Sequence, residues 1–138
     1  MAIPFPDGSF DAVGIAFGIR NMPERLAALK EMMRVLVPGG RIYILEMNAP
    51  PDRLRRGVFA PYLGRILPVV ARLFSQNPAA YRYLVDSILH FPSPPAFIAL
   101  MEEAGFCQTE RYSLTLGITS CYIGRKAAEG DPAGPSAG

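Results

Sequence analysis

The stretches PERLAALKEMMRVL at residues 23–36 and PGGRIYILEM at 38–47 decide the fold of this chain. In the first, apolar residues recur at helical spacing, and Pro23 suits the first turn of a helix. These apolar residues are Leu26, Leu29, Met33 and Leu36. The Pro-Gly-Gly triplet ends a helix, and the apolar run that follows it is typical of a strand covered on both faces. We therefore expect a helix over 23–36 and a strand over 41–47.

A second strand is expected at 10–17, where FDAVGIAF follows a turn rich in Pro, Asp and Gly. A strand, a crossover helix and another strand make a parallel unit, so the chain belongs to the α/β class. Pro94-Pro95 then opens a further helix that Gly105 closes. Two final strands are expected at 107–114 and 118–126, antiparallel and joined near 115–117.

Composition excludes several classes of protein. The chain has 138 residues, enough for one domain or part of one, and 50% of them are hydrophobic. A net charge of +2 is too small for a generic nucleic-acid binder. One His and two widely separated Cys give no zinc spacing and no disulfide framework, so we expect no metal and a reduced, cytoplasmic setting.

The segment from 52 to 82 differs from its surroundings, because it holds six Arg, one acidic residue and several aromatic residues. Together with the following residues it predicts an inserted helical cap at about 52–91. A basic, aromatic segment can contact anionic lipid headgroups, which would make the protein membrane-peripheral, or it can form helices with a solvated Arg face. The last residues, 127–138, are rich in Ala, Gly and Pro and are expected to be a disordered tail.

Seven short motifs are spread along the sequence: PFPDGSFDA at 4–12, AFGIRN at 16–21, RVLVPGGR at 34–41, AYRYL at 80–84, SI at 87–88, AGF at 104–106 and LTLGI at 114–118. Together they resemble the S-adenosylmethionine-dependent methyltransferases, and more narrowly the ubiquinone/menaquinone biosynthesis C-methyltransferase family. The resemblance extends to about Lys126, and it departs from the family at Tyr122, where a His is frequent.

The resemblance implies a Rossmann-like class I methyltransferase fold, of which residues 1–126 would form the C-terminal half. In the family's numbering of strands, this half holds strands in the order 4-5-7-6. The glycine-rich turn on which the family holds the methyl donor has no counterpart in the sequence. We therefore expect the isolated chain to be inactive and to lack part of the donor site.

The reaction implied by the resemblance transfers a methyl group from S-adenosylmethionine to a ring carbon of a polyprenyl quinol. Such a carbon reacts once a neighbouring phenol loses its proton, so the site needs a base and a positive group. Arg20 and Asn21 follow a strand end, where ligands of α/β sheets bind, and are the expected catalytic residues. The alternative is structural: Arg20 pairs with an acid such as Glu24, and Asn21 caps the next helix.

Other candidates surround this position. Ala16 and Phe17 match the family segment beside the cofactor, with an ordinary core residue of a central strand as the alternative for Phe17. The substrate pocket is expected to include Tyr81, Tyr83 and His90, with helix packing or capping as the alternative. Glu46 either faces the same cleft or pairs with an Arg of the inserted segment.

A second hypothesis concerns the strand at 10–17, because in the family its other neighbour is a strand that this sequence does not include. The open edge would then pair with an N-terminal half or with a second copy, as in a homodimer. On this interpretation the chain is a non-catalytic interaction module. A further alternative is a remnant without activity.

Overall fold

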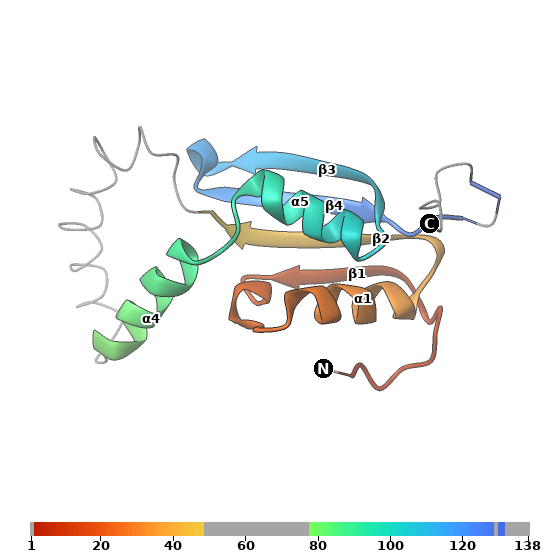
Figure 1. Cartoon of the computed structure of the whole chain (residues 1–138), viewed down its shortest axis with the longest axis horizontal. Coiled ribbons are helices and arrows are strands. Elements are labelled where there is room, and N and C mark those ends of the chain that lie inside the picture. The colour runs from red at the N-terminus through yellow and green to blue at the C-terminus, as the bar shows by residue number, and fades with distance from the viewer. Residues whose placement is uncertain (1, 49–77, 129, 132–138) are drawn as a thin grey trace.

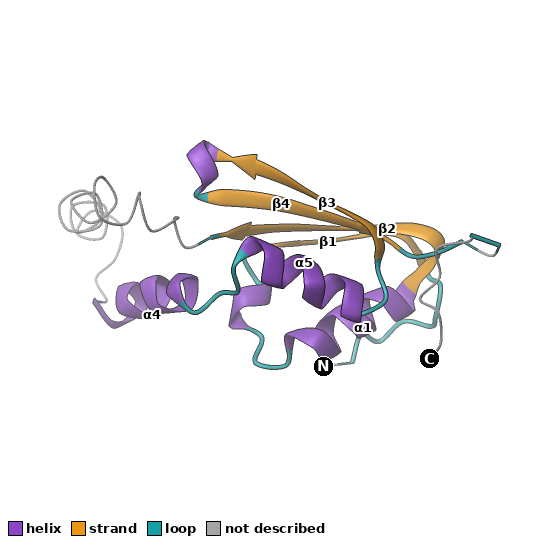
Figure 2. Ribbon diagram, turned by 45° about the horizontal axis from the view of Figure 1, so that its top comes forward, coloured by secondary structure: helices purple, strands orange, loops and turns teal. Residues whose placement is uncertain are grey.

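Four strands form one sheet, and the helices α1 and α5 pack on one of its faces (Figures 1 and 2). The computed structural model describes residues 2–48, 78–128 and 130–131. The elements are β1 (Phe10–Ala16), η1 (Ile19–Asn21), α1 (Arg25–Val35), β2 (Leu36–Met47), α4 (Pro78–Leu89), α5 (Pro94–Glu103), β3 (Cys107–Leu114), η4 (Thr115–Gly117) and β4 (Thr119–Arg125). The expected α/β class is confirmed.

The strands lie in the order β1-β2-β4-β3. β1 and β2 are parallel, with Val13 opposite Ile42, whereas β4 is antiparallel to both of its neighbours. The strand that comes last among these four in the sequence thus lies between the second and the third. The antiparallel pair at the end of the chain and the turn between its strands lie where the sequence predicted them.

β2 begins earlier than the sequence predicted, at Leu36 instead of residue 41, and so includes the Pro-Gly-Gly triplet. Backbone pairing extends the strand: Leu36 lies opposite Phe10 of β1, and Gly39 and Gly40 exchange backbone hydrogen bonds with Lys126 (2.9 and 2.8 Å). The side chain of Lys126 also stabilises the end of the preceding helix. Its Nζ donates hydrogen bonds to the carbonyl oxygens of Met33 (3.0 Å) and Leu36 (2.7 Å), at the C-terminus of α1. A cation placed there satisfies carbonyl groups that the helix leaves free. α1 therefore ends at Val35, and the strand starts directly after it.

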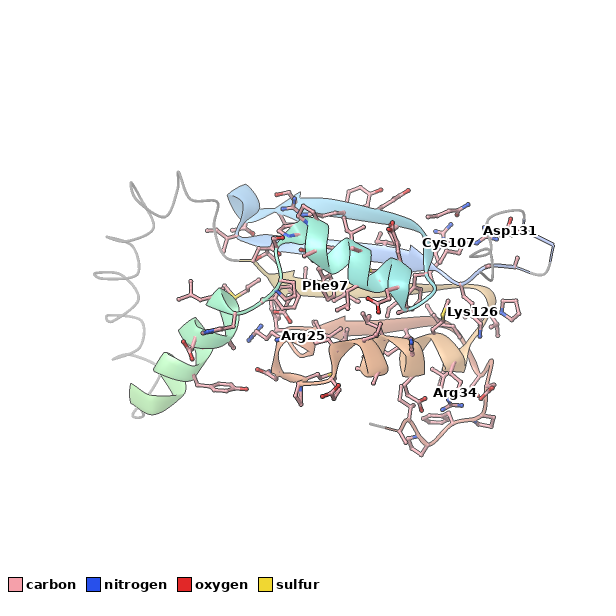
Figure 3. All side chains as sticks on the ribbon, in the orientation of Figure 1. Arg25, Arg34, Phe97, Cys107, Lys126 and Asp131 are labelled. Carbon is pink, nitrogen blue, oxygen red and sulfur yellow. The ribbon has the colours of Figure 1, made fainter. Side chains whose placement is uncertain are left out.

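The hydrophobic core lies between the sheet and the helices α1 and α5. Phe97 of α5 is fully buried, and its ring centroid lies 4.8 Å from that of Tyr122 and 4.9 Å from that of Phe91. Figure 3 labels Phe97 beside α5, over the strands of the sheet. Gly105 (φ 103°) turns the chain from α5 into β3, and a Cβ there would lie 3.0 Å from Met33 Sδ. The glycine thus lets α5 approach α1 closely.

Tyr122, the departure from the family pattern, belongs to a buried polar group between β2 and β4. Its hydroxyl donates to Asn48 Oδ1 at 2.7 Å, and Asn48 Nδ2 donates to Ser120 Oγ at 2.5 Å. All three side chains are buried, and burial raises the pKa of Tyr122. Because buried polar groups are costly unless they are hydrogen-bonded, this set is a structural link between the two strands.

The N-terminal segment is fastened to α1 by Arg34. Its guanidinium donates to Glu31 Oε1 (2.7 Å), Asp7 Oδ1 (2.6 Å) and the carbonyl oxygen of Ile3 (3.0 Å), and Glu31 Oε1 also accepts from the Ile3 N–H. The hydrogen bond from Arg34 is the main reason why the pKa of Glu31 falls to about 2. Figure 3 labels Arg34 at this junction.

The expected inserted cap is described only in part. Its last part forms α4, whereas residues 52–77 lie outside the described residues, as does most of the expected tail. At the start of that tail, Asp131 Oδ2 lies 3.0 Å from Arg125 Nη1. Within residues 2–48, 78–128 and 130–131, no helix is long and apolar enough to span a membrane.

Candidate functional site

The candidate site lies at the carboxyl ends of β1 and β2, where ligands of α/β sheets bind. The last contact between the two strands is the hydrogen bond from the Phe17 N–H to the Leu45 carbonyl oxygen (2.8 Å). Beyond it the chain turns into η1, which carries Arg20 and Asn21. The structure thus places both expected catalytic residues just after a strand end, as the sequence predicted.

Arg20 forms an ion pair with Glu46, the residue near the end of β2. Its Nη1 lies 2.5 Å from Glu46 Oε1, and the two side chains are 10% and 0% exposed. Arg20 also lies over the ring of Phe17, with its Cζ 5.9 Å from the ring centroid. The structural alternative, in which Arg20 pairs with a carboxylate, is confirmed, but the carboxylate is that of Glu46 and not that of Glu24. Among the described residues Glu46 pairs with Arg20. The arginine side chains of the inserted segment lie outside the described residues, so a pairing of Glu46 with one of them stays a prediction.

Asn21 joins η1 to α4. Its Oδ1 accepts a hydrogen bond from the Tyr83 hydroxyl at 3.0 Å. The alternative that Asn21 caps α1 is wrong, because the residue at the N-cap is Glu24, which makes no capping bond through its side chain. The amide of Asn21 therefore faces α4 and not the start of α1.

A cleft of about 250 Å³ lies between the chain from η1 to the start of α1 and the helix α4. Four of the site residues that the sequence predicted line this cleft: Arg20, Asn21, Tyr83 and His90. Met22, Pro23, Arg25, Asp86 and Ser87 also line it. Figure 1 shows α4 extending away from the sheet at the end where the arrows of β1 and β2 point.

His90 lies at the end of α4 with its side chain 75% exposed. Its Nδ1 is 2.8 Å from the carbonyl oxygen of Asp86. Because a carbonyl oxygen can only accept, Nδ1 carries the proton in this bond, and Nε2 keeps a free lone pair in the neutral ring. His90 therefore has both a local hydrogen bond and an atom that can accept a proton.

Ala16 and Phe17, the expected cofactor-binding residues, do not line this cleft. Both are exposed at the end of β1, and Phe17 has a positive φ of 54° with 42% of its surface exposed. The alternative that Phe17 is a core residue is wrong, because the strand ends one residue earlier, at Ala16. The side chain of Tyr81, which lies in α4, is outside the described residues.

Arg25 is a residue of the cleft that the sequence interpretation missed. It extends from the first turn of α1 toward α4, where Figure 3 labels it. Its Nη2 donates to the Arg20 carbonyl oxygen (3.1 Å), and its Cζ lies 5.7 Å from the centroid of the Phe91 ring. A cation in the first turn of a helix opposes the helix dipole. That unfavourable position is the signal in the sequence that could have identified Arg25.

A model of the ubiE/COQ5 methyltransferase family matches residues 1–126. The chain belongs to this family. The ubiquinone/menaquinone biosynthesis C-methyltransferase UbiE of Geobacter sulfurreducens is 52% identical over 125 residues, a match that covers 91% of this chain and 48% of that protein. Demethylmenaquinone methyltransferase of Thermus thermophilus is 47% identical, with 90% and 56% covered. This ubiE/COQ5 member spans about half the length of the curated relatives it matches, and the family expected from its motifs is confirmed.

Solved structures support the fold of this ubiE/COQ5 family member. A possible exported protein from Bordetella parapertussis matches with a TM-score of 0.62 at 16% identity, covering 89% of this chain and 41% of that one. A SAM-dependent methyltransferase from Thermotoga maritima matches with a TM-score of 0.56 at 19% identity, covering 90% and 59%. The expected class I methyltransferase fold is thereby confirmed.

Proposed function

We propose that the chain forms the acceptor side of an enzyme that methylates a ring carbon of a polyprenyl quinol in menaquinone or ubiquinone biosynthesis, with S-adenosylmethionine as donor. The relatives named above carry this activity in their names. The observation that carries the proposal is the shared cleft. Arg20 and Asn21, which follow β1, line it together with Tyr83 of α4 and His90, which directly follows α4. A cation, an amide, a phenol and an imidazole thus border one open space.

Three residues of the cleft would each have a separate role toward the acceptor. A ring carbon becomes a nucleophile when its neighbouring phenol loses a proton, and the Arg20 guanidinium stabilises the phenolate that forms. The Oδ1 of Asn21 already accepts from Tyr83, so its Nδ2 is the atom left to donate to an acceptor oxygen. His90 Nε2 is placed to accept the phenolic proton and to pass it to solvent, since its side chain is largely exposed.

The residues present fit one side of the donor. Phe17 exposes its ring and takes a backbone conformation that few residues other than glycine adopt, directly after β1. Strain of this kind concentrates at functional sites. Ala16 and Phe17 would hold S-adenosylmethionine from this side, and the cofactor supplies an electrophilic methyl group when it is bound.

Reconstitution tests the proposal. The chain is mixed with a polypeptide covering the part of the Geobacter sulfurreducens relative that it does not match, and transfer of labelled methyl groups to a short-chain prenyl naphthoquinol and benzoquinol is measured. We expect product with the mixture and none with either polypeptide alone. Arg20→Ala should lower turnover by about 10²- to 10³-fold, the usual effect of removing an electrostatic stabiliser. The matched control is Arg41→Ala, which removes an exposed Arg of β2.

Two results would contradict this proposal. One is tight, saturable binding of S-adenosylmethionine to the chain alone, because the chain would then need no second polypeptide for the donor. The other is normal turnover of the reconstituted Arg20→Ala protein. The ratio of the rates with the two quinols assigns the substrate class.

The free edge of β1 supports a second candidate function, that of an interaction module. Among the described residues β1 pairs with β2 alone. An unpaired strand edge is a template for another strand, supplied by an N-terminal half or by a second copy in a homodimer. Light scattering with and without the other polypeptide distinguishes these partners, and a chain that stays monomeric in the mixture would reject both.

The proposed location is the cytoplasm, with peripheral contact to a membrane where a polyprenyl quinol dissolves. The arginines of residues 52–82 motivate this contact. Co-sedimentation with anionic vesicles should occur at low salt and decline at high salt. An absence of binding at low salt would reject membrane contact. No nucleic-acid partner is proposed.

A further inference from the structure

The carboxylate of Glu46 lies fully buried at the end of β2, beside the cleft. It accepts from Arg20 Nη1 at 2.5 Å, from the backbone N–H of Met47 at 3.0 Å and from the backbone N–H of Arg20 at 3.3 Å. Burial of a carboxylate is unfavourable unless it is paired and hydrogen-bonded. Glu46 meets this condition because its carboxylate accepts hydrogen bonds from both the backbone N–H and the guanidinium of Arg20.

These contacts fix Arg20 in two ways. The bond to its backbone N–H holds the start of η1 against β2, and the bond to Nη1 holds the end of the side chain. The Arg20 side chain is only 10% exposed, and Arg20 lines the cleft. An arginine side chain has many rotamers when it is free, so a fixed partner determines where its charge lies.

We propose that Glu46 is a positioning residue, which holds the Arg20 guanidinium at the point where the phenolate of the acceptor forms. This inference rests on the proposed function and adds a residue to it. Glu46 does not touch the acceptor but acts through Arg20. Its carboxylate reaches Arg20 because the parallel strands β1 and β2 bring their carboxyl ends together.

A role in charge balance alone makes a different prediction. If Glu46 only neutralises Arg20, Glu46→Asp keeps the negative charge and should leave the binding of anions unchanged. Glu46→Gln removes that charge and should strengthen the binding of anions. If Glu46 positions Arg20, Glu46→Asp should be the more harmful change, because the shorter side chain withdraws its oxygens from Nη1. Gln keeps the length and an accepting oxygen, so Glu46→Gln should retain part of the positioning.

The first measurement is nitrogen NMR of the arginine guanidinium groups in the 138-residue chain, and it requires no methyl transfer. In the unmodified chain we expect slow rotation and separate Nη signals for Arg20, with averaged signals for the exposed Arg41 as an internal control. Glu46→Asp should average the Arg20 signals and Glu46→Gln should do so less. Averaged Arg20 signals in the unmodified chain, or unchanged signals in Glu46→Asp, would overturn the proposal. If a variant does not fold, the spectrum of the unmodified chain still decides.

The second measurement is binding of 4-nitrophenol, whose neutral and ionised forms differ in absorbance. We expect Glu46→Asp to weaken binding of the ionised form about tenfold, the effect of losing one charge-assisted hydrogen bond. Stronger binding in Glu46→Gln together with unchanged binding in Glu46→Asp would overturn the proposal. If the unmodified chain binds no 4-nitrophenolate, the acceptor side of the proposed function fails, and the NMR result separately decides whether Glu46 holds Arg20.

Discussion

The Tyr83 hydroxyl donates a hydrogen bond to Asn21 Oδ1 over 3.0 Å, although the two residues are 62 positions apart in the sequence. This bond ties α4 to η1, and so it ties one wall of the cleft to the other. A single exposed contact thus helps to set the width of the space in which an acceptor would bind.

Tyr83→Phe removes this bond and keeps the aromatic ring. We expect the free energy of local opening of α4 to fall by about 0.5 kcal/mol, which is at the lower end of the range for a hydrogen bond. Amide hydrogen exchange of α4 measures the change. The matched control is Tyr112→Phe, which removes the bond from an exposed Tyr to Glu110 in β3. Equal exchange of α4 in both variants would show that the bond to Asn21 does not hold the helix.

The Glu31 carboxylate should make stability depend on pH. Its pKa is lowered from 4.5 to about 2, chiefly by the hydrogen bond from Arg34, so the folded protein favours the ionised form. The stabilisation is therefore complete above pH 4.5 and is lost as the pH falls toward 2. Urea unfolding across this window should show a smaller loss of stability in Glu31→Gln than in the unmodified chain. An identical pH dependence would refute the role of this carboxyl.

Gly105 and Gly14 offer a matched comparison of backbone strain. Gly105→Ala should destabilise the chain by about 1–2 kcal/mol or more, because φ is 103° and the added Cβ would lie 3.0 Å from Met33 Sδ and Cε. Gly14→Ala meets no atom within 4 Å and should be neutral or stabilising by up to about 1 kcal/mol. Thermal unfolding of both variants provides the measurement. A Gly105→Ala protein as stable as Gly14→Ala would contradict the close approach of α5 to α1.

Phe97 anchors α5 to the sheet. Phe97→Ala should lower the free energy of unfolding by about 3–5 kcal/mol, since its ring is fully buried between those of Phe91 and Tyr122. Phe5→Ala, at a position that is 50% exposed, should cost about 1 kcal/mol or less. Denaturant titration measures both values. Similar losses of unfolding free energy in the two variants would show that Phe97 does not anchor the hydrophobic core.

The fold was largely predictable from the sequence because its signals are local. The helical spacing of apolar residues in α1, the prolines that open α5 and the apolar run of β2 each act within a few residues. The early start of β2 was not predictable, because it depends on the backbone pairing of Leu36 with Phe10 and of Gly39 with Lys126, residues that are distant in the sequence.

The site was predictable in place but not in its contacts. Arg20 and Asn21 follow a strand end, which a sequence pattern reveals. Their partners, Glu46 and Tyr83, are set by the pairing of β1 with β2 and by the position of α4, and neither leaves a local signal. Phe17 was ambiguous for a related reason, because a strand that ends one residue earlier moves an apolar side chain from the core to the surface.

The last of the described strands occupies an interior place in the sheet, because β4 lies between β2 and β3. On the ribosome β3 is made first, yet among the described strands its one partner is still to be synthesised. Proteins are translated at about 5–20 residues per second. Both edges of β3 therefore stay unpaired while the turn and β4 are synthesised. Among the described strands, the sheet therefore closes only after Thr119–Arg125 has been synthesised, and until then β3 has no strand to pair with.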